Sequence, residues 1–178
     1  SKLMEVITEN SDAYLISDEV YEDFSYEKSH FSPASQKEYF DRIISLFSFS
    51  KSYGVTGWRV GYVLVNEVII KELLKVSQFN LTSVNPFAQF CCQQLISSSR
   101  LQNKLKYNIQ KQEKRIGLVK MLVRNSSLEN FISIPQGAFY SLLDIKRKGM
   151  KSSEYCQYLL ERENVSLIPG LAYGKKFD

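Results

Sequence analysis

The chain has 178 residues, of which 44% are hydrophobic and 24% are charged, and its formal net charge at pH 7 is +4. These values are ordinary for a soluble globular protein with one or two domains. Basic residues are scattered, with only short clusters at 146–148 and 175–176, so no nucleic-acid partner is expected. No apolar run approaches membrane-spanning length, and the first residues show no signal-peptide pattern, so no membrane partner is expected either.

The cysteines and the histidine are not spaced like metal ligands. Cys91 and Cys92 are neighbours and Cys156 stands apart, so we expect unpaired thiols that pack as small apolar side chains in a reducing cytoplasm. His30, the single histidine, is flanked by serine and proline and is expected to be a surface loop residue. The sequence therefore predicts no metal site and no histidine-dependent catalytic triad.

The first hundred residues read as part of a large α/β domain. A short amphipathic helix ends near Asn10, and short apolar runs predict buried strands. A polar, proline-containing stretch at 22–36 predicts a loop. The other elements expected in this part are strands at 13–16, 43–47 and 58–65 and helices at 68–76 and 86–96.

The remaining residues predict one long helix followed by a small α+β unit. Apolar residues recur at near-helical spacing across a strongly charged segment, which indicates a helix at about 100–124. Ser152-Ser153-Glu154 offers N-cap chemistry for a later helix. The elements expected after the long helix are strands at 131–134, 138–145 and 165–168 and a helix at 152–163.

The most informative segment runs from Ser48 to Tyr62, with Lys51 between two serines and Arg59 eight residues further on. The preceding apolar run places Lys51 just past a strand end, where open α/β sheets present their ligand sites. Serine hydroxyls and the planar fork of an arginine suit a phosphate. A lysine amine beside a phosphate site can form a Schiff base with pyridoxal phosphate.

This segment resembles the cofactor-lysine signature of the pyridoxal-phosphate-dependent, fold-type I aminotransferases of class I and II. Three more segments are similar to motifs of the same family and occur in the family's order over nearly the whole chain. They are Ser17-Asp18-Glu19-Val20-Tyr21, Ile134-Pro135-Gln136-Gly137-Ala138-Phe139-Tyr140 and Ile168-Pro169-Gly170-Leu171-Ala172-Tyr173-Gly174.

The resemblance implies an architecture. Residues 1–99 would belong to the large cofactor-binding α/β domain, and residues 100–178 would form the interdomain helix and the small C-terminal domain. The chain would be about the second half of the family pattern, truncated at both ends. The full-length protein would be a cytoplasmic homodimer that moves an amino group between an L-amino acid and a 2-oxo acid.

The resemblance also assigns roles to residues. Lys51 would bind the cofactor and move the substrate α-proton, Asp18 would pair with the pyridine nitrogen, and Tyr21 would hydrogen-bond the phenolic oxygen. Val20 would lie against one face of the ring. The phosphate would be held by Ser48 and Arg59, with Ser50 as a weaker candidate.

Two other functions are also compatible with these residues. A C–S lyase or another pyridoxal-phosphate enzyme of the same fold would carry similar residues, because fold and cofactor do not fix the reaction. A non-catalytic, aminotransferase-like regulator is the second alternative. The family's glycine-rich phosphate loop and carboxylate-binding arginine have no counterpart here, so residues 1–178 alone are not expected to be active. The substrate side chain is left undecided.

Overall fold

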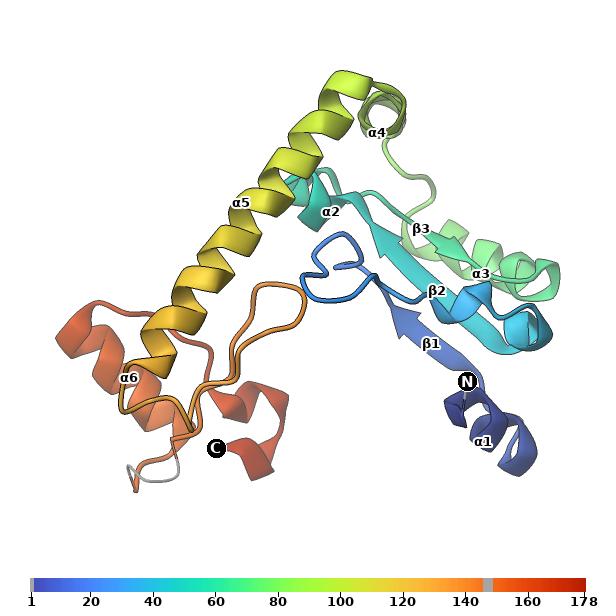
Figure 1. Ribbon diagram of the computed structural model, residues 1–178. Coiled ribbons are helices and arrows are strands. Elements are labelled where there is room, and N and C mark those ends of the chain that lie inside the picture. The colour runs from blue at the N-terminus through green and yellow to red at the C-terminus, as the bar shows by residue number, and fades with distance from the viewer. Residues whose placement is uncertain (1, 146–148) are drawn as a thin grey trace. The chain divides into compact units, whose positions relative to one another are not determined.

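The computed structural model describes residues 2–145 and 149–178, so the basic run at 146–148 lies outside the described residues. The chain forms two compact units (Figure 1). The first is Ser1–Ile116 with Gln136–Phe139, and the second is Gly117–Pro135 with Tyr140–Asp178. The division at residues 99 and 100 concerns the family's domains and stays a prediction.

The first unit contains a three-stranded sheet in the order β1-β2-β3. Strands β1 (Leu15–Asp18) and β2 (Ile43–Ser48) run parallel, and β3 (Gly61–Leu64) runs antiparallel to β2. The three predicted strands are confirmed, with β1 shifted by two residues. β3 is shorter than predicted because residues 56–58 form a 3-10 turn and Arg59 takes a left-handed backbone with φ 55°.

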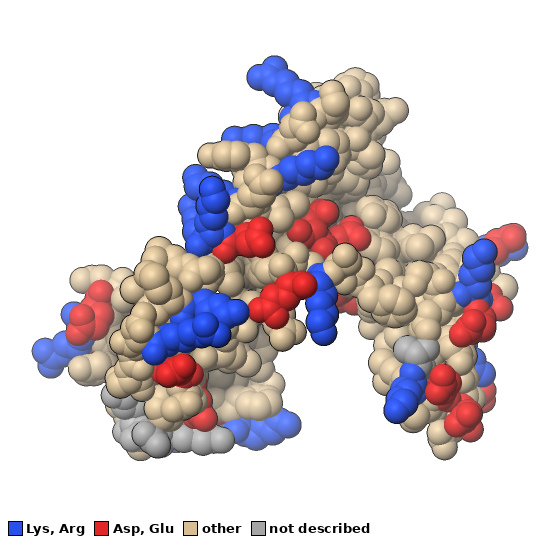
Figure 2. Space-filling view, viewed as in Figure 1, with Lys and Arg blue, Asp and Glu red and all other residues tan. Residues whose placement is uncertain are grey.

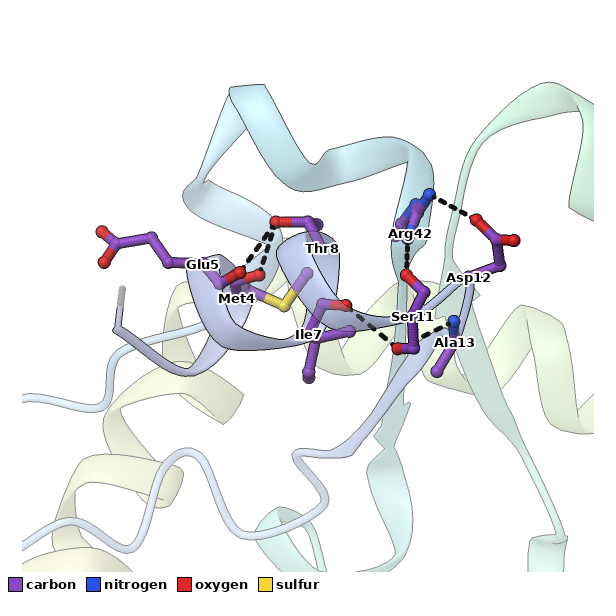
Figure 3. A network of polar contacts seen from close by, with 8 residues as sticks. All are labelled: Met4, Glu5, Ile7, Thr8, Ser11, Asp12, Ala13 and Arg42. Atoms are coloured by element: carbon purple, nitrogen blue, oxygen red, sulfur yellow. Dashed lines mark hydrogen bonds and ion pairs between the residues drawn. The ribbon is translucent and has the colours of Figure 1, made fainter.

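Helix α1 (Lys2–Asn10) is joined to β1 by a turn that Arg42 holds. The Arg42 guanidinium donates to the Ser11 carbonyl oxygen at 2.6 Å and to Oδ1 of Asp12 at 3.2 Å (Figure 3). The Ser11 hydroxyl donates back to the Ile7 carbonyl oxygen at 3.0 Å. Arg42 itself ends the 3-10 turn that leads into β2, so one side chain ties together the segments that precede the two parallel strands.

Helices α3 (Glu67–Asn80) and α4 (Pro86–Ser97) begin at asparagine caps. Oδ1 of Asn66 accepts from the Ile69 amide, and Oδ1 of Asn85 accepts from the amides of Phe87 and Ala88. An asparagine N-cap satisfies amides that have no partner inside the helix. Both predicted helices are confirmed, and α3 extends four residues further than expected.

A hydrophobic core lies beneath the short helix α2 (Phe49–Ser52), which follows β2. It consists of Phe49, Val60, Ala88 and Cys92, with Tyr53, Val55, Val84 and Leu95 packed against it. Cys92 behaves as the small apolar residue expected, and burial raises the pKa of its thiol. This core fixes α2 against α4, which matters because α2 carries Lys51.

The long helix α5 (Ser99–Arg124) and helix α6 (Ser152–Glu163) confirm the predicted helices. The cap of α6 differs from the prediction in its two serines, while Glu154 does take part by accepting from the Lys151 amide at 3.1 Å. The N-cap residue is Lys151, and Ser152 and Ser153 lie inside the first turn. Their hydroxyls and the Ser153 amide donate to Oδ1 of Asp178 at 2.9–3.1 Å, so a carboxylate satisfies the start of this helix.

The strands predicted after α5 are wrong as regular strands. Residues 131–133 and 142–144 run antiparallel, but only the bridge between Ile132 and Leu143 forms. The Leu142 amide donates to the Ser133 hydroxyl instead of a backbone carbonyl, which interrupts the ladder. The run from 138 is broken at its start because Ala138 has φ 55°.

The final predicted strand, at 165–168, is also absent from the described residues. The reason lies at the end of α6, where Asn164 takes a left-handed backbone with φ 55°. The Val165 amide then bonds back to the Leu159 carbonyl oxygen at 3.2 Å. This is the usual way to close a helix, and it uses the donor that would have begun a strand ladder.

On the face in Figure 2, acidic and basic side chains are interspersed with uncharged areas. Among the described residues, the structure contains no helix with the length and apolar character needed to cross a membrane.

Candidate active site

The candidate residues gather at one edge of the sheet because β1 and β2 are parallel. β1 ends at Asp18, β2 ends at Ser48, and the pairing of Asp18 with Leu46 places both ends at the same edge. In open α/β sheets this carboxyl edge is where ligands bind. The turn after β1 and helix α2 after β2 therefore form the two sides of the site.

Lys51 lies on α2 and is half-buried, while its neighbours Phe49, Ser50 and Ser52 are buried. Phe49 sits in the core beneath the helix, so the backbone that carries Lys51 is anchored from below. The end of α2 is held as well, because Nε2 of Gln102 donates to the Tyr53 hydroxyl at 2.9 Å. The lysine thus projects from a fixed support.

The structure brings Lys51 and Tyr21 together. Nζ of Lys51 lies 5.9 Å from the centroid of the Tyr21 ring, within the range of a cation–π contact. The Phe139 ring also packs against the Tyr21 ring edge to face, with centroids 5.2 Å apart. These residues are far apart in the sequence, so the fold itself assembles this part of the site.

Asp18 and Val20 occupy the first turn after β1. Oδ1 of Asp18 accepts from the Val20 amide at 3.3 Å, the local turn that aspartate side chains commonly make. The Asp18 side chain is exposed and Val20 is partly buried. The turn therefore presents the carboxylate outward at the strand end.

The predicted phosphate-binding group is only partly assembled. The Ser48 hydroxyl caps α2 by accepting from the Ser50 amide at 3.2 Å, and Ser50 is buried. Arg59 is exposed, and its guanidinium donates to the Thr56 carbonyl oxygen at 3.0 Å. Within residues 2–145 and 149–178, no hydrogen bond or ion pair joins Arg59 to Ser48 or Lys51.

Sequence reasoning missed a polar cluster centred on Glu19. Oε2 of Glu19 lies 2.6 Å from Nε2 of His30, and Oε1 accepts from the Ser32 hydroxyl at 3.0 Å. His30 is the exposed loop residue that the sequence predicts, and its side chain keeps 34% of its exposure, but its contact with Glu19 was not predicted. The alternation of residues along a strand could have indicated that Glu19 is buried, because Glu19 lies on the same face as Leu15 and Ser17.

The surroundings of Glu19 favour its charged form. Burial raises the pKa of the Glu19 carboxyl, but the nearby Ser45 hydroxyl and the hydrogen bonds from His30 and Ser32 outweigh burial. The pKa therefore lies below its usual value. The fully buried Ser45 hydroxyl makes no hydrogen bond among the described residues.

The family described as aminotransferase class I and II matches residues 1–176. An aspartate aminotransferase of Pyrococcus abyssi is 33% identical over 165 residues, which are 92% of this chain and 42% of that protein. An aromatic-amino-acid aminotransferase of Thermococcus litoralis is 30% identical over 165 residues, which are also 92% of this chain and 42% of that protein. The chain thus spans about two fifths of the length of these relatives.

Solved structures agree with this match. The aromatic aminotransferase from Pyrococcus horikoshii has a TM-score of 0.90 and 31% sequence identity, over 98% of this chain and 46% of that one. This likeness confirms the predicted α/β fold class with a partial large-domain sheet. The four motifs and the fold lead to one family, and the chain belongs to the class I and II aminotransferases.

Proposed function

We propose that the whole protein is a pyridoxal-phosphate-dependent aminotransferase that moves an amino group between an L-amino acid and a 2-oxo acid. The observation that carries the proposal is the placement of Lys51 over the Tyr21 ring, at 5.9 Å, on the carboxyl edge of the sheet. The family match supports it, because the relatives include proteins named as aspartate and aromatic-amino-acid aminotransferases.

The chemistry of the donor set fits this cofactor. When bound, pyridoxal phosphate supplies an electrophilic aldehyde and an electron-withdrawing ring. Lys51 offers the primary amine that an aldehyde requires, and it is held by a buried helix rather than by a free loop. The same amine, once released, would move the proton from the substrate α-carbon.

Asp18 would serve the ring nitrogen. A carboxylate within a few ångströms of a basic nitrogen favours its protonated form. The exposed carboxylate at the end of β1 has one oxygen engaged with the Val20 amide, which orients the group and leaves the other oxygen for a ligand. Tyr21 would donate to the phenolic oxygen, and Val20 would pack against the ring.

Ser48, Ser50 and Arg59 would bind the phosphate. The Ser48 hydroxyl and the start of α2 lie next to Lys51, as a group attached to the same ring requires. Arg59 can join them once its guanidinium leaves the Thr56 carbonyl oxygen. The charge-assisted bond to a phosphate is stronger than the neutral-acceptor bond it replaces.

The proposal includes a homodimer in the cytoplasm. Large apolar side chains are exposed on α3 and α4, among them Val68, Phe79 and Phe87, and Phe79 keeps 94% of its exposure. Exposed apolar surface of this kind is normally covered by further protein. The rest of the polypeptide and a second subunit would provide that cover, and the free cysteines fit a reducing compartment.

An assay of the purified whole protein distinguishes this function from its alternatives. We expect an L-amino acid and 2-oxoglutarate to give glutamate and the corresponding 2-oxo acid. Pyruvate and ammonia formed without a 2-oxo acid acceptor would identify a C–S lyase instead. Absence of both reactions in cofactor-loaded protein would favour a non-catalytic regulator. Testing a panel of L-amino acids in the same assay would show whether the protein belongs to the aspartate, the aromatic or the alanine subfamily.

A further inference from the structure

Glu19 carries a buried carboxylate directly beside the candidate site residues. Its side chain is only 1% exposed, and both oxygens are engaged, one by His30 and one by Ser32. Its amide donates to the Leu46 carbonyl oxygen at 2.9 Å and extends the β1–β2 ladder by one residue. Its carbonyl oxygen accepts from the Glu22 amide at 3.0 Å.

These bonds place Glu19 at the base of the turn that carries the candidate site residues. Asp18 precedes it, and Val20 and Tyr21 follow within the turn that the Glu19–Glu22 bond closes. A second bond, from the Phe24 amide to the Tyr21 carbonyl oxygen at 2.9 Å, continues this turn. The position of the Tyr21 ring beneath Lys51 therefore depends on how firmly Glu19 is held.

His30 and Ser32 hold it from outside the turn. Both lie in a loop that is 11 and 13 residues further along the chain, so their bonds cross-link two segments that the backbone alone would leave independent. An ionised carboxylate only accepts hydrogen bonds, so Nε2 of His30 donates to it. Removing a partner leaves a buried charge incompletely satisfied, which is costly.

We propose that Glu19, clamped by His30 and Ser32, is a positioning residue that fixes Asp18 and Tyr21 relative to Lys51. This inference rests on the proposed function, since it concerns the same site. Glu19 acts through the turn and needs no contact with substrate or cofactor. Small displacements of a positioned group reduce turnover more than they reduce binding.

The test uses Glu19→Gln, His30→Ala and Ser32→Ala in the whole protein, with Glu38→Gln as the matched control at an exposed position. The first readout is hydrogen exchange without cofactor. We expect faster exchange of the Glu22 and Phe24 amides in the three cluster variants, with the amides of α3 unchanged. The control should exchange like the wild type.

The second readout is kinetic. The cluster variants should lose about 10-fold to 100-fold in kcat with little change in KM, while the control keeps both. Faster exchange across the whole first unit would overturn the proposal in favour of a general stabilising role. Unchanged exchange and kcat in all three variants would overturn it as well.

The readouts separate this proposal from the function it builds on. If the wild type neither binds pyridoxal phosphate nor transaminates, the proposed function fails, while the exchange data still decide whether Glu19 holds the turn. If Glu19→Gln does not fold, His30→Ala and Ser32→Ala decide, since each removes one bond and leaves the carboxylate in place.

Discussion

Replacement of Lys51 by alanine is expected to lower kcat of the whole protein by about 10³-fold or more. Alanine removes both the amine that binds the cofactor and the group that moves the substrate α-proton, and a positioned acid–base group alone contributes on the order of 10²- to 10⁴-fold. Because α2 is anchored by Phe49 in the core, the helix should survive the change. Steady-state transamination kinetics and circular dichroism measure the two effects.

The control for this prediction is Lys71→Ala. Lys71 is an exposed lysine on α3, paired with Glu67 at 2.9 Å, so its loss should leave kcat unchanged. Wild-type turnover by Lys51→Ala would remove the basis of the assignment. A loss of activity in both variants would indicate that lysine substitutions act through folding.

Asp18→Asn is expected to lower kcat on the order of 10²-fold with little change in KM. Asparagine preserves the shape and can still accept from the Val20 amide, so the turn should stay in place. It lacks the negative charge that keeps the ring nitrogen protonated, and a neighbouring carboxylate shifts such a pKa by about one to three units. The lost interaction is stronger in the transition state, so the effect falls on kcat.

A matched aspartate distinguishes the charge effect at the site from a general one. Asp12→Asn removes a fully exposed carboxylate that contacts Arg42, and it should leave kcat at the wild-type value. Equal turnover of Asp18→Asn and wild type would show that Asp18 does not face the ring nitrogen.

Much of the fold could be predicted from local patterns in the sequence. The apolar runs before Asp18 and Lys51 each predict a strand, and the charged segment with recurrent leucines predicts α5, because burial and periodicity act over neighbouring residues. The placement of Lys51 and Asp18 at strand ends follows from these strands. Their common edge follows from parallel pairing, which the structure supplies.

The features that could not be predicted depend on contacts between distant residues or on single backbone angles. Glu19 meets His30 only because the loop after it folds back. Arg59 takes a left-handed backbone, and its guanidinium donates to the Thr56 carbonyl oxygen. The Ser133 hydroxyl accepts from the Leu142 amide in the place of a backbone carbonyl oxygen, and the alternation of apolar residues gives no indication of this. Side-chain hydrogen bonds of this kind compete with regular structure and are set by tertiary context.

The assignment of Lys51 as the cofactor lysine is tested most directly by chemical trapping. The whole protein, loaded with pyridoxal phosphate, is reduced with borohydride, digested and mapped by mass spectrometry. We expect one modified peptide, with the pyridoxyl group on Lys51, and no modification in Lys51→Ala. A label on another lysine, or no label in cofactor-saturated wild-type protein, would contradict the assignment.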